Sequence, residues 1–413
     1  MGKPTIRFEG YTDDWEQRKL SEISDVRDGT HDSLSYLNDG HPFVTSKNVK
    51  DGYINYDDIK YISDEDFEAI NKRSKVDVND ILMGMIATIG NLALIRTEPD
   101  FAIKNVALIK DTKQVSYMYL YHYLQSSSTE RQLLSGLDGG TQKFVSLKNI
   151  RELNIMVPSE AEQLKVGNFI ESLDHLITLH QRKCEETKKL KKFMLQKMFP
   201  QKGEKVPKIR FDGFTDDWEQ RKLEDIIEKL TGGASIAPDD YVDAGYRTIP
   251  KGAVNSSGIA DMSGCKIVSE DFFKKNISSK TSSGELVTSL RDLVSTAPNM
   301  GRIVRICGDY EDFLMPQGVY SIIVKKKISE DFLIAYSNSP EYRKIIMAEK
   351  NGSTQVHIRN GEFLNIDIPL PSYEEQMKIG KQFNYLDHLI TLHQRKCEEL
   401  QNIKKFMLQN MFV

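Results

Sequence analysis

The segment LDHLITLHQRKCEE occupies residues 173–186 and returns unchanged at residues 386–399. Around each copy, apolar positions recur at alternating steps of three and four residues, as in a helix that packs lengthwise against another helix. The centre of this seam is Ile170, Leu173, Ile177, His180 and Cys184 in the first copy, and Phe383, Leu386, Ile390, His393 and Cys397 in the second. The sequence therefore predicts one long helix stated twice, at residues 158–200 and 371–413.

Each predicted helix needs a partner along its length. A helix of about 40 residues is about 60 Å long, more than most single domains cover with their own core. One amphipathic helix alone would usually pack on its own domain, but the duplication gives each helix a matching neighbour. We predict that the two pair as an antiparallel coiled coil related by a pseudo-two-fold axis, although the spacing itself leaves a parallel pair open.

A second duplicated block opens each half of the chain. PTIRFEGYTDDWEQRKL at residues 4–20 matches PKIRFDGFTDDWEQRKL at residues 207–223, with Trp15 and Trp218 at equivalent places. Buried aromatic anchors far outnumber base-stacking platforms, so we expect both tryptophans to dock their blocks on their own halves. The predicted domains are then residues 1–157, the helix 158–200, a polar linker 201–206, residues 207–370 and the helix 371–413.

The regions between the copied blocks differ from each other in sequence. Both nevertheless contain short apolar runs broken by glycine, which indicate strands. We expect a polar helix at residues 63–75, and one helix closing each region at residues 116–134 and 329–350. The predicted fold class is α+β, with two globular mixed α/β domains, called heads below, joined by the paired helices.

Composition excludes several classes of protein. There are 56 Lys and Arg against 60 Asp and Glu, a net charge of −4, which argues against a wholly nonspecific nucleic-acid binder. The four cysteines form no closely spaced ligand pair, and two lie in the helix seam, so free thiols in a reducing cytoplasm are expected. No apolar run is long enough to span a membrane, and the first residues lack a signal-peptide core.

Catalytic signatures are missing as well. The chain has no GxxxxGK[ST], GxGxxG, HExxH or GxSxG motif, so we predict neither a catalytic nor a metal site. Asp100, Asp111 and Lys113 resemble the spaced acids and lysine of a metal-dependent nuclease. The matching stretch of the other half carries lysines at 325–327 instead, and such a short pattern arises easily by chance.

Two further elements are shared between the halves. GGTQ at residues 139–142 corresponds to GSTQ at 352–355, and PSEAEQ at 158–163 corresponds to PSYEEQ at 371–376. With the opening blocks and the repeated LDHLITLHQRKCEE, these motifs make the whole chain resemble the specificity subunit of type I restriction-modification enzymes. No single motif is decisive, but two copies of all of them in the same order form a specific match.

The resemblance implies a division of labour. Each head would be a target-recognition domain reading one half of a split, asymmetric site on double-stranded DNA. The paired helices would space the heads and dock two methyltransferase (M) subunits, and two restriction/translocase (R) subunits would complete the complex. S-adenosylmethionine, ATP and Mg²⁺ would bind to those partners. This chain would bind no cofactor and would not itself be an enzyme.

Polar residues near the shared turns are the first candidates for contacts with DNA. Asn and Gln can pair with adenine edges, and Arg and Lys with guanine or phosphate, but each position is also open to a plain turn or surface role. A tether whose heads bind proteins, or a self-contained enzyme, are the other functions considered. The predicted DNA-binding residues are Thr45, Ser46, Lys47, Asn48, Thr141, Gln142 and Lys143 in the first head, and Lys251, Arg291, Arg302, Thr354, Gln355 and Arg359 in the second.

Overall fold

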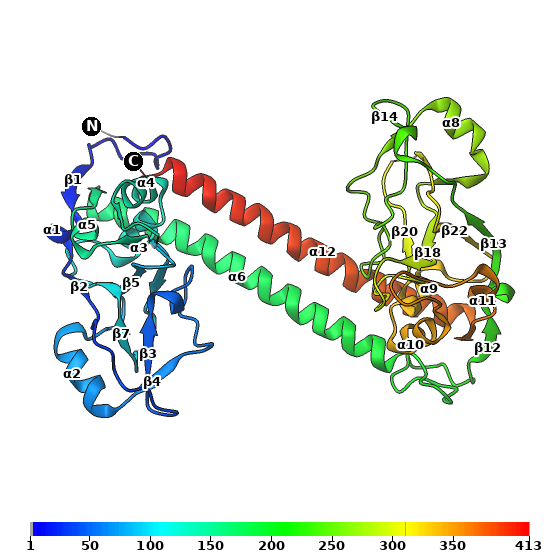
Figure 1. Cartoon of the computed structure of the whole chain (residues 1–413), viewed down its shortest axis with the longest axis horizontal. Coiled ribbons are helices and arrows are strands. Elements are labelled where there is room, and N and C mark those ends of the chain that lie inside the picture. The colour runs from blue at the N-terminus through cyan, green and yellow to red at the C-terminus, as the bar shows by residue number, and fades with distance from the viewer. Residues whose placement is uncertain (1–2, 142, 310, 413) are drawn as a thin grey trace. The chain divides into compact units, whose positions relative to one another are not determined.

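The computed structural model describes residues 3–141, 143–309 and 311–412. These form two compact units, the first made of residues 1–180 with 395–413 and the second of residues 181–394. Two helices of 38 residues each, α6 (Glu160–Lys197) and α12 (Tyr373–Asn410), contribute to both units (Figure 1). They lie inside the ranges 158–200 and 371–413 expected from the repeat. None of the helices in the described part of the chain is long and apolar enough to cross a membrane.

The first unit holds a mixed set of short strands and helices. In chain order these are β1 (Glu16–Lys19), α1 (Leu20–Ile23), β2 (Val26–Asp28), β3 (His41–Thr45), η1 (Ser46–Asn48), β4 (Lys60–Ile62), α2 (Asp64–Ser74), β5 (Ile81–Gly84), β6 (Leu92–Leu94), β7 (Ala102–Lys104), β8 (Val106–Ile109), α3 (Tyr117–Leu124), α4 (Ser127–Ser135), β9 (Leu137–Asp138), β10 (Phe144–Val145), α5 (Leu147–Arg151), β11 (Asn154–Val157) and the start of α6. Its largest sheet has four antiparallel strands in the order β2-β8-β5-β6.

This sheet is buried on both faces. Ile81 and Met83 belong to the core that includes α3 and the start of α6. Leu82, between them, faces a separate core on the other side, because successive side chains of a strand point in opposite directions. Burial on both sides explains why the strand reads as an unbroken apolar run, and strands are confirmed in this apolar run broken by glycine.

The second unit repeats this plan. Its elements are β12 (Glu219–Lys222), α7 (Leu223–Ile226), β13 (Ile227–Gly232), η2 (Pro238–Asp240), β14 (Tyr241–Val242), β15 (Tyr246–Arg247), β16 (Ile267–Val268), α8 (Glu270–Lys275), η3 (Ile277–Ser279), β17 (Lys280–Ser282), β18 (Leu286–Ser289), β19 (Arg291–Asp292), β20 (Ile303–Arg305), β21 (Asp312–Leu314), β22 (Val319–Val324), α9 (Glu330–Ser337), α10 (Pro340–Glu349), β23 (Val356–His357), α11 (Asn360–Leu364), β24 (Asp367–Leu370) and part of α12. Its main sheet has the order β13-β22-β18-β20.

Two helix predictions were wrong in the same way. The single helices expected at 116–134 and 329–350 are each two helices, α3 and α4 in the first unit and α9 and α10 in the second. At each break a serine begins the second helix: Ser126 Oγ accepts a hydrogen bond from Thr129 N, and Ser339 Oγ accepts one from Tyr342 N. A serine in this position ends one helix and caps the next, and Pro340 strengthens the second break.

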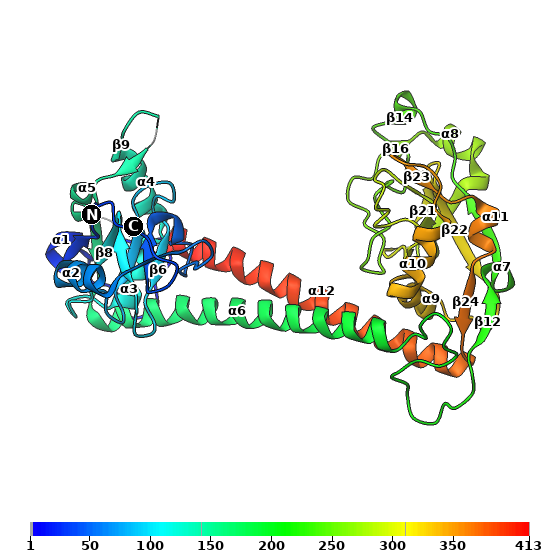
Figure 2. The same cartoon turned by 60° about the horizontal axis from the view of Figure 1, so that its bottom comes forward.

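Within each unit the two long helices run antiparallel. In the first unit Lys404 on α12 pairs with Asp174 on α6 at 2.7 Å, and the last residues of α12 lie beside the first half of α6 (Figures 1 and 2). In the second unit Lys191 pairs with Asp387, and the Cys184 thiol lies 4.0 Å from the Ile390 carbonyl. The predicted seam is buried at Ile170, Leu173, Ile177, Cys184, Phe383 and Leu386, and half-buried at His180, Ile390, His393 and Cys397.

The opening blocks are docked by the tryptophans and by one ion pair each. Trp15 and Trp218 are buried. Arg7 donates two hydrogen bonds, of 2.7 and 2.8 Å, to buried Glu162 at the start of α6. Arg210 makes the same pair of bonds, both 2.8 Å, with Glu375 at the start of α12. The tryptophans are therefore anchors, as expected.

Candidate nucleic-acid interface

Loops of the first unit meet at one edge of its main sheet. Strands β2 and β5 end where β8 begins, because both are antiparallel to β8. Strand β3 runs parallel to β7, which leads into β8, so η1 arrives at the same place. Bonds from Ser46 Oγ to the Asn105 carbonyl and from Thr88 Oγ1 to the Ser46 carbonyl tie these loops together.

The GGTQ turn joins this edge. Ile86 and Phe144 form a β-bridge, and Val145 N donates to Met85 O at 3.0 Å. We call the set of residues 29–33, 46–48, 85–91, 105, 139–141 and 143–144 the first loop edge. Thr141 and Lys143 are exposed on it. Gln142, predicted as a DNA contact, lies outside the described residues.

The second unit has an equivalent edge. Strands β13 and β18 end where β22 begins. The pairing of Arg291 with His357 between β19 and β23 then brings in the GSTQ turn. We call residues 233–237, 290–302, 316–318 and 352–357 the second loop edge. The two heads thus present different side chains from the same topological position.

Three of the four neighbouring candidates in the first head hold the chain in shape. Ser46 and Asn48 are buried. Asn48 Oδ1 accepts a 2.7 Å bond from Thr45 Oγ1, and its amide donates to Asn55 O at 3.0 Å. Only Lys47 is exposed. Ser46 and Asn48 therefore form the turn that carries Lys47.

Arg302 also makes contacts inside its own head. Its guanidinium donates to the Pro298 carbonyl at 2.7 Å and also bonds the Asn338 side chain. Burial, with Arg343 nearby, lowers the pKa of Arg302 to about 10. A guanidinium turned inward in this way supports the loop after β19.

The remaining candidates of the second head are exposed. Arg291, Thr354 and Gln355 project from the second loop edge. Arg359 follows it, precedes α11 and lies 3.5 Å from Glu362. Lys251 is exposed just after the parallel bridge between Thr248 and Leu314, which carries the chain toward this edge.

One residue of the first loop edge was missed in the sequence. His31 is 61% exposed, with Nε2 2.8 Å from Asp28 Oδ2 and Nδ1 2.5 Å from Asn105 Oδ1. The Asp28 carboxylate, helped by Asn105, raises the pKa of His31. The sequence feature that could have indicated His31 is the polar run DGTHD, which directly follows the apolar start of β2. Binding residues are often found in the loops that follow buried strands.

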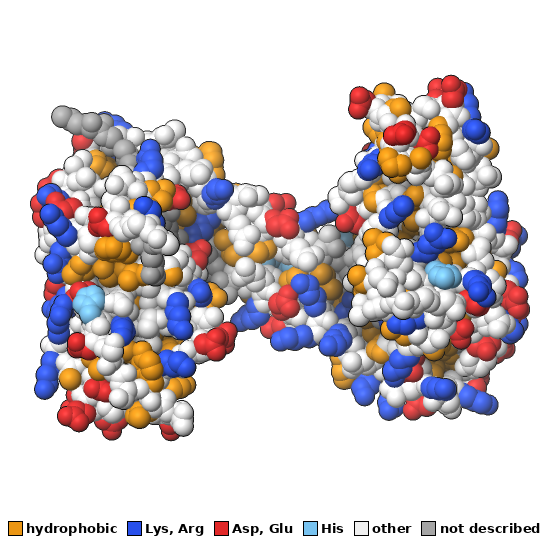
Figure 3. Space-filling view, in the orientation of Figure 1, with side chains coloured by type: hydrophobic (Ala, Val, Ile, Leu, Met, Phe, Trp, Pro, Cys, Tyr) orange, Lys and Arg blue, Asp and Glu red, His pale blue; other side chains and the backbone are white. Residues whose placement is uncertain are grey.

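Charges of both signs are interspersed on the surface. On the face drawn in Figure 3, Lys and Arg side chains alternate with Asp and Glu on each unit, in keeping with the net charge of −4. Exposed apolar side chains also occur on the long helices. They are Leu176, Ile403 and Phe406 in the first unit and Leu190, Phe193 and Leu392 in the second, which we call the helix stripes. They lie off the seam, where no residue of their own unit covers them fully.

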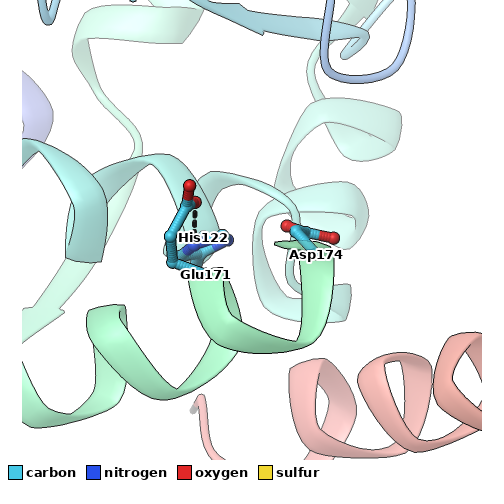
Figure 4. A group of neighbouring side chains, drawn as sticks. All are labelled: His122, Glu171 and Asp174. Carbon is cyan, nitrogen blue, oxygen red and sulfur yellow. Dashed lines mark ion pairs between the residues drawn. The ribbon is translucent and has the colours of Figure 1, made fainter. Parts of the chain in front are cut away.

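His122 of α3 forms a cluster with Glu171 and Asp174 of α6 (Figure 4). Their possible ligand atoms are within 4.8 Å of one another. Glu171 is already paired with Arg96 at 2.8 Å, and Asp174 with Lys404. Two carboxylates balanced by two cations do not favour a further divalent ion. We interpret the cluster as an ion-pair network around a buried imidazole.

Comparison with known proteins decides the family. The model of the type I restriction modification DNA specificity domain matches residues 12–189 and again residues 215–402. The chain belongs to this family. The two matches coincide with the two copies of the frame, each consisting of an opening block, a head and a long helix.

The relatives are specificity subunits of type I restriction enzymes, one matching over nearly the whole length and another over a shorter part. The type I restriction enzyme MjaVIII specificity subunit of Methanocaldococcus jannaschii is 24% identical over 407 residues, covering 95% of this chain and 91% of that protein. The EcoBI specificity subunit of Escherichia coli is 26% identical over 167 residues, 39% of this chain and 35% of that protein.

Solved structures agree on the fold. The S subunit of a type I restriction-modification system from M. genitalium superposes with a TM-score of 0.65 at 14% identity, covering 100% of this chain and 99% of that one. A chain from a structure of type I R-M complex assembly gives 0.54 at 17% identity, covering 96% and 97%. The predicted α+β architecture with antiparallel long helices is confirmed.

Proposed function

We propose that this chain is the DNA-recognition and scaffold subunit of a type I restriction-modification complex. The observation that carries the proposal is the duplicated frame with two unlike loop edges. A frame copied almost letter for letter, with heads that have diverged, suits a protein that reads two different short sequences. The target is then bipartite and asymmetric, on double-stranded DNA.

The exposed candidates on or beside the loop edges are the proposed readers. In the first head these are Lys47, Thr141 and Lys143, with Gln142 kept as a sequence-based candidate and Thr45 as a support of the turn. In the second they are Lys251, Arg291, Thr354, Gln355 and Arg359. Lysine and arginine can bind phosphates or guanine, and glutamine can form hydrogen bonds with adenine. Because the two sets differ, each head has its own half-site.

Catalysis belongs to partner subunits in this proposal. The helix stripes give each unit an exposed apolar surface for a protein partner, so two methyltransferase subunits dock, one for each stripe, and two restriction/translocase subunits join them. S-adenosylmethionine, ATP and Mg²⁺ bind to those partners, and this chain carries none of them. The complex works in the cytoplasm, where its DNA is accessible.

Co-expression with the cognate methyltransferase tests the function. Methylated adenines mapped across the host genome should define one bipartite, non-palindromic motif with an unread gap. Replacing residues 21–152 by the head of a relative should change one block of the motif and leave the other block intact. Scattered methylation without a motif would contradict DNA recognition and favour the alternative, a tether whose heads bind proteins.

A further inference from the structure

One loop of the second head exposes apolar side chains without any cover. Leu293 is 74% exposed, the largest value for a big hydrophobic residue in the described part of the chain, and its neighbour Val294 is 48% exposed. Both lie on the second loop edge, in the connection from β18 to β20. The matching connection of the first head is shorter, at residues 85–91, and has no such tip.

The loop is held in place from behind. Asp292 accepts hydrogen bonds from Val294 N at 3.3 Å and Asn299 N at 3.1 Å. Arg343 donates to the carbonyls of Ala297 and Met300, both at 2.6 Å. Ala297 is buried and has a φ of 44°, a conformation that costs a non-glycine residue energy. These contacts fix Leu293 outward, which means that its exposure is built into the loop.

The surroundings of this tip suit DNA better than a protein core. Arg291 lies two residues before Leu293, is exposed, and has no ion-pair partner among the residues that the structure describes. Its strand partner is His357, next to the GSTQ turn with exposed Thr354 and Gln355. The carboxylate of the adjacent Asp292 is turned into the loop. The guanidinium of Arg291 can bind a phosphate, and the amide of Gln355 can bind a base edge. The fixed Leu293 can contact the methyl group of thymine, which is the apolar group that the major groove displays.

We propose that Leu293, supported by Val294, is a specificity-determining residue that contacts the C5-methyl group of a thymine in the half-site of the second head. Arg291 anchors the same segment through a phosphate or guanine edge. This inference rests on the proposed DNA-recognition function. It adds which loop of this head reads the DNA, and by what chemistry.

The test uses the subunit assembled with its methyltransferase and duplexes carrying the mapped target. Each thymine of the second half-site is replaced in turn by uracil, which removes the methyl group alone. At one position the wild-type complex should bind the uracil duplex about fourfold more weakly, the value of one buried methyl group. The Leu293→Ser complex should bind both duplexes with the same, weakened affinity.

Leu164→Ser is the matched control, because Leu164 is also exposed but lies at the start of α6 in the first unit and belongs to neither loop edge. It should keep the wild-type difference between thymine and uracil. Equal thermal unfolding of the variants shows that the loop change has not disturbed the fold.

The outcomes separate the inference from the function on which it rests. If Leu293→Ser keeps the full thymine preference, or if it loses a protein partner while DNA selectivity is unchanged, the inference is wrong and DNA recognition stands. If the wild-type complex has no preference for the mapped target over other duplexes, the proposed function itself fails.

Discussion

Among single residues, His122 has the most unusual surroundings. Its side chain is fully buried, its ring nitrogens have no hydrogen-bond partner among the described residues, and Glu171 lies 3.7 Å away. Burial lowers the pKa of His122. Glu171 and Asp174 oppose this shift, and Lys404 adds to it. Arg96 is paired with Glu171. In the unfolded chain the pKa of this histidine is about 6.5. Below that pH the unfolded chain therefore binds a proton at His122, whereas the imidazole stays neutral in the folded chain.

Stability should consequently fall as the pH drops below about 6.5. The loss approaches about 1.4 kcal/mol for each pKa unit by which the folded value lies below the unfolded one. Urea unfolding at pH 7.5 and 5.5 measures it. His122→Leu should remove most of this difference, whereas His175→Leu, at an exposed position on α6, should retain it. An unchanged pH dependence in His122→Leu would contradict the assignment. Glu171, whose pKa nearby His122 and Arg96 lower to about 2, adds its own loss only below its ordinary 4.5.

The helices of each unit approach closely at equivalent glycines. A Cβ on Gly380 of α12 would lie 2.8 Å from Phe332 N and from Asp331 Cβ, both at the start of α9. A Cβ on Gly167 of α6 would lie 3.1 Å from Tyr119 N of α3. These are backbone or near-backbone atoms that cannot move aside easily. Glycine is therefore needed where α6 packs against α3 and where α12 packs against α9.

Gly380→Ala should lower the free energy of unfolding by about 1–3 kcal/mol, because overpacking outweighs the better helix propensity of alanine. Gly167→Ala should lower it less. Gly361→Ala in α11 is the control: nothing lies within 4 Å of its Cβ, and the change should stabilise the chain slightly. Denaturant unfolding of the three variants checks the order. A neutral Gly380→Ala would mean that α9 and α12 can separate without cost.

Elements marked by repetition could be predicted from the sequence, and elements set by tertiary contacts could not. Two copies of one heptad pattern determine both long helices and their seam, and two copies of the tryptophan block indicate an anchor. The break at Ser126 was missed because serine also occurs inside helices. The direction of the Arg302 side chain could not be predicted, because it depends on a carbonyl brought near by the fold. Residue type alone did not separate Lys47, which projects, from Asn48, which holds the turn.

For the whole molecule, each unit is completed by the end of the helix that starts in the other half of the sequence. The first unit buries Met411 and Phe412, with the Phe412 ring 5.7 Å from Tyr119 and 5.4 Å from Tyr123. The second buries Met198 and Phe199, with the Phe199 ring 5.4 Å from Tyr336. Both pairs end the same motif, since KFMLQKMF at 192–199 matches KFMLQNMF at 405–412.

This equivalence predicts the behaviour of a fragment of residues 1–206. In this fragment the first head lacks Met411 and Phe412, which complete its core in the full chain. Met198 and Phe199 at the end of α6 lack the second head, in which they are buried in the full chain. Two copies can exchange these ends, and Lys191 of each copy can then take the place of Lys404 beside Asp174. We therefore expect a symmetric homodimer, measured as twice the fragment mass by light scattering after gel filtration.

Phe199→Ser should weaken this dimer, while Gln196→Ser, a change at an exposed position, should not. With the methyltransferase, such a dimer should methylate a palindromic motif made of the first half-block twice. A stable, folded monomer would contradict this prediction. It would show that the core of the first head forms without Met411 and Phe412, the two side chains that fill it in the full chain.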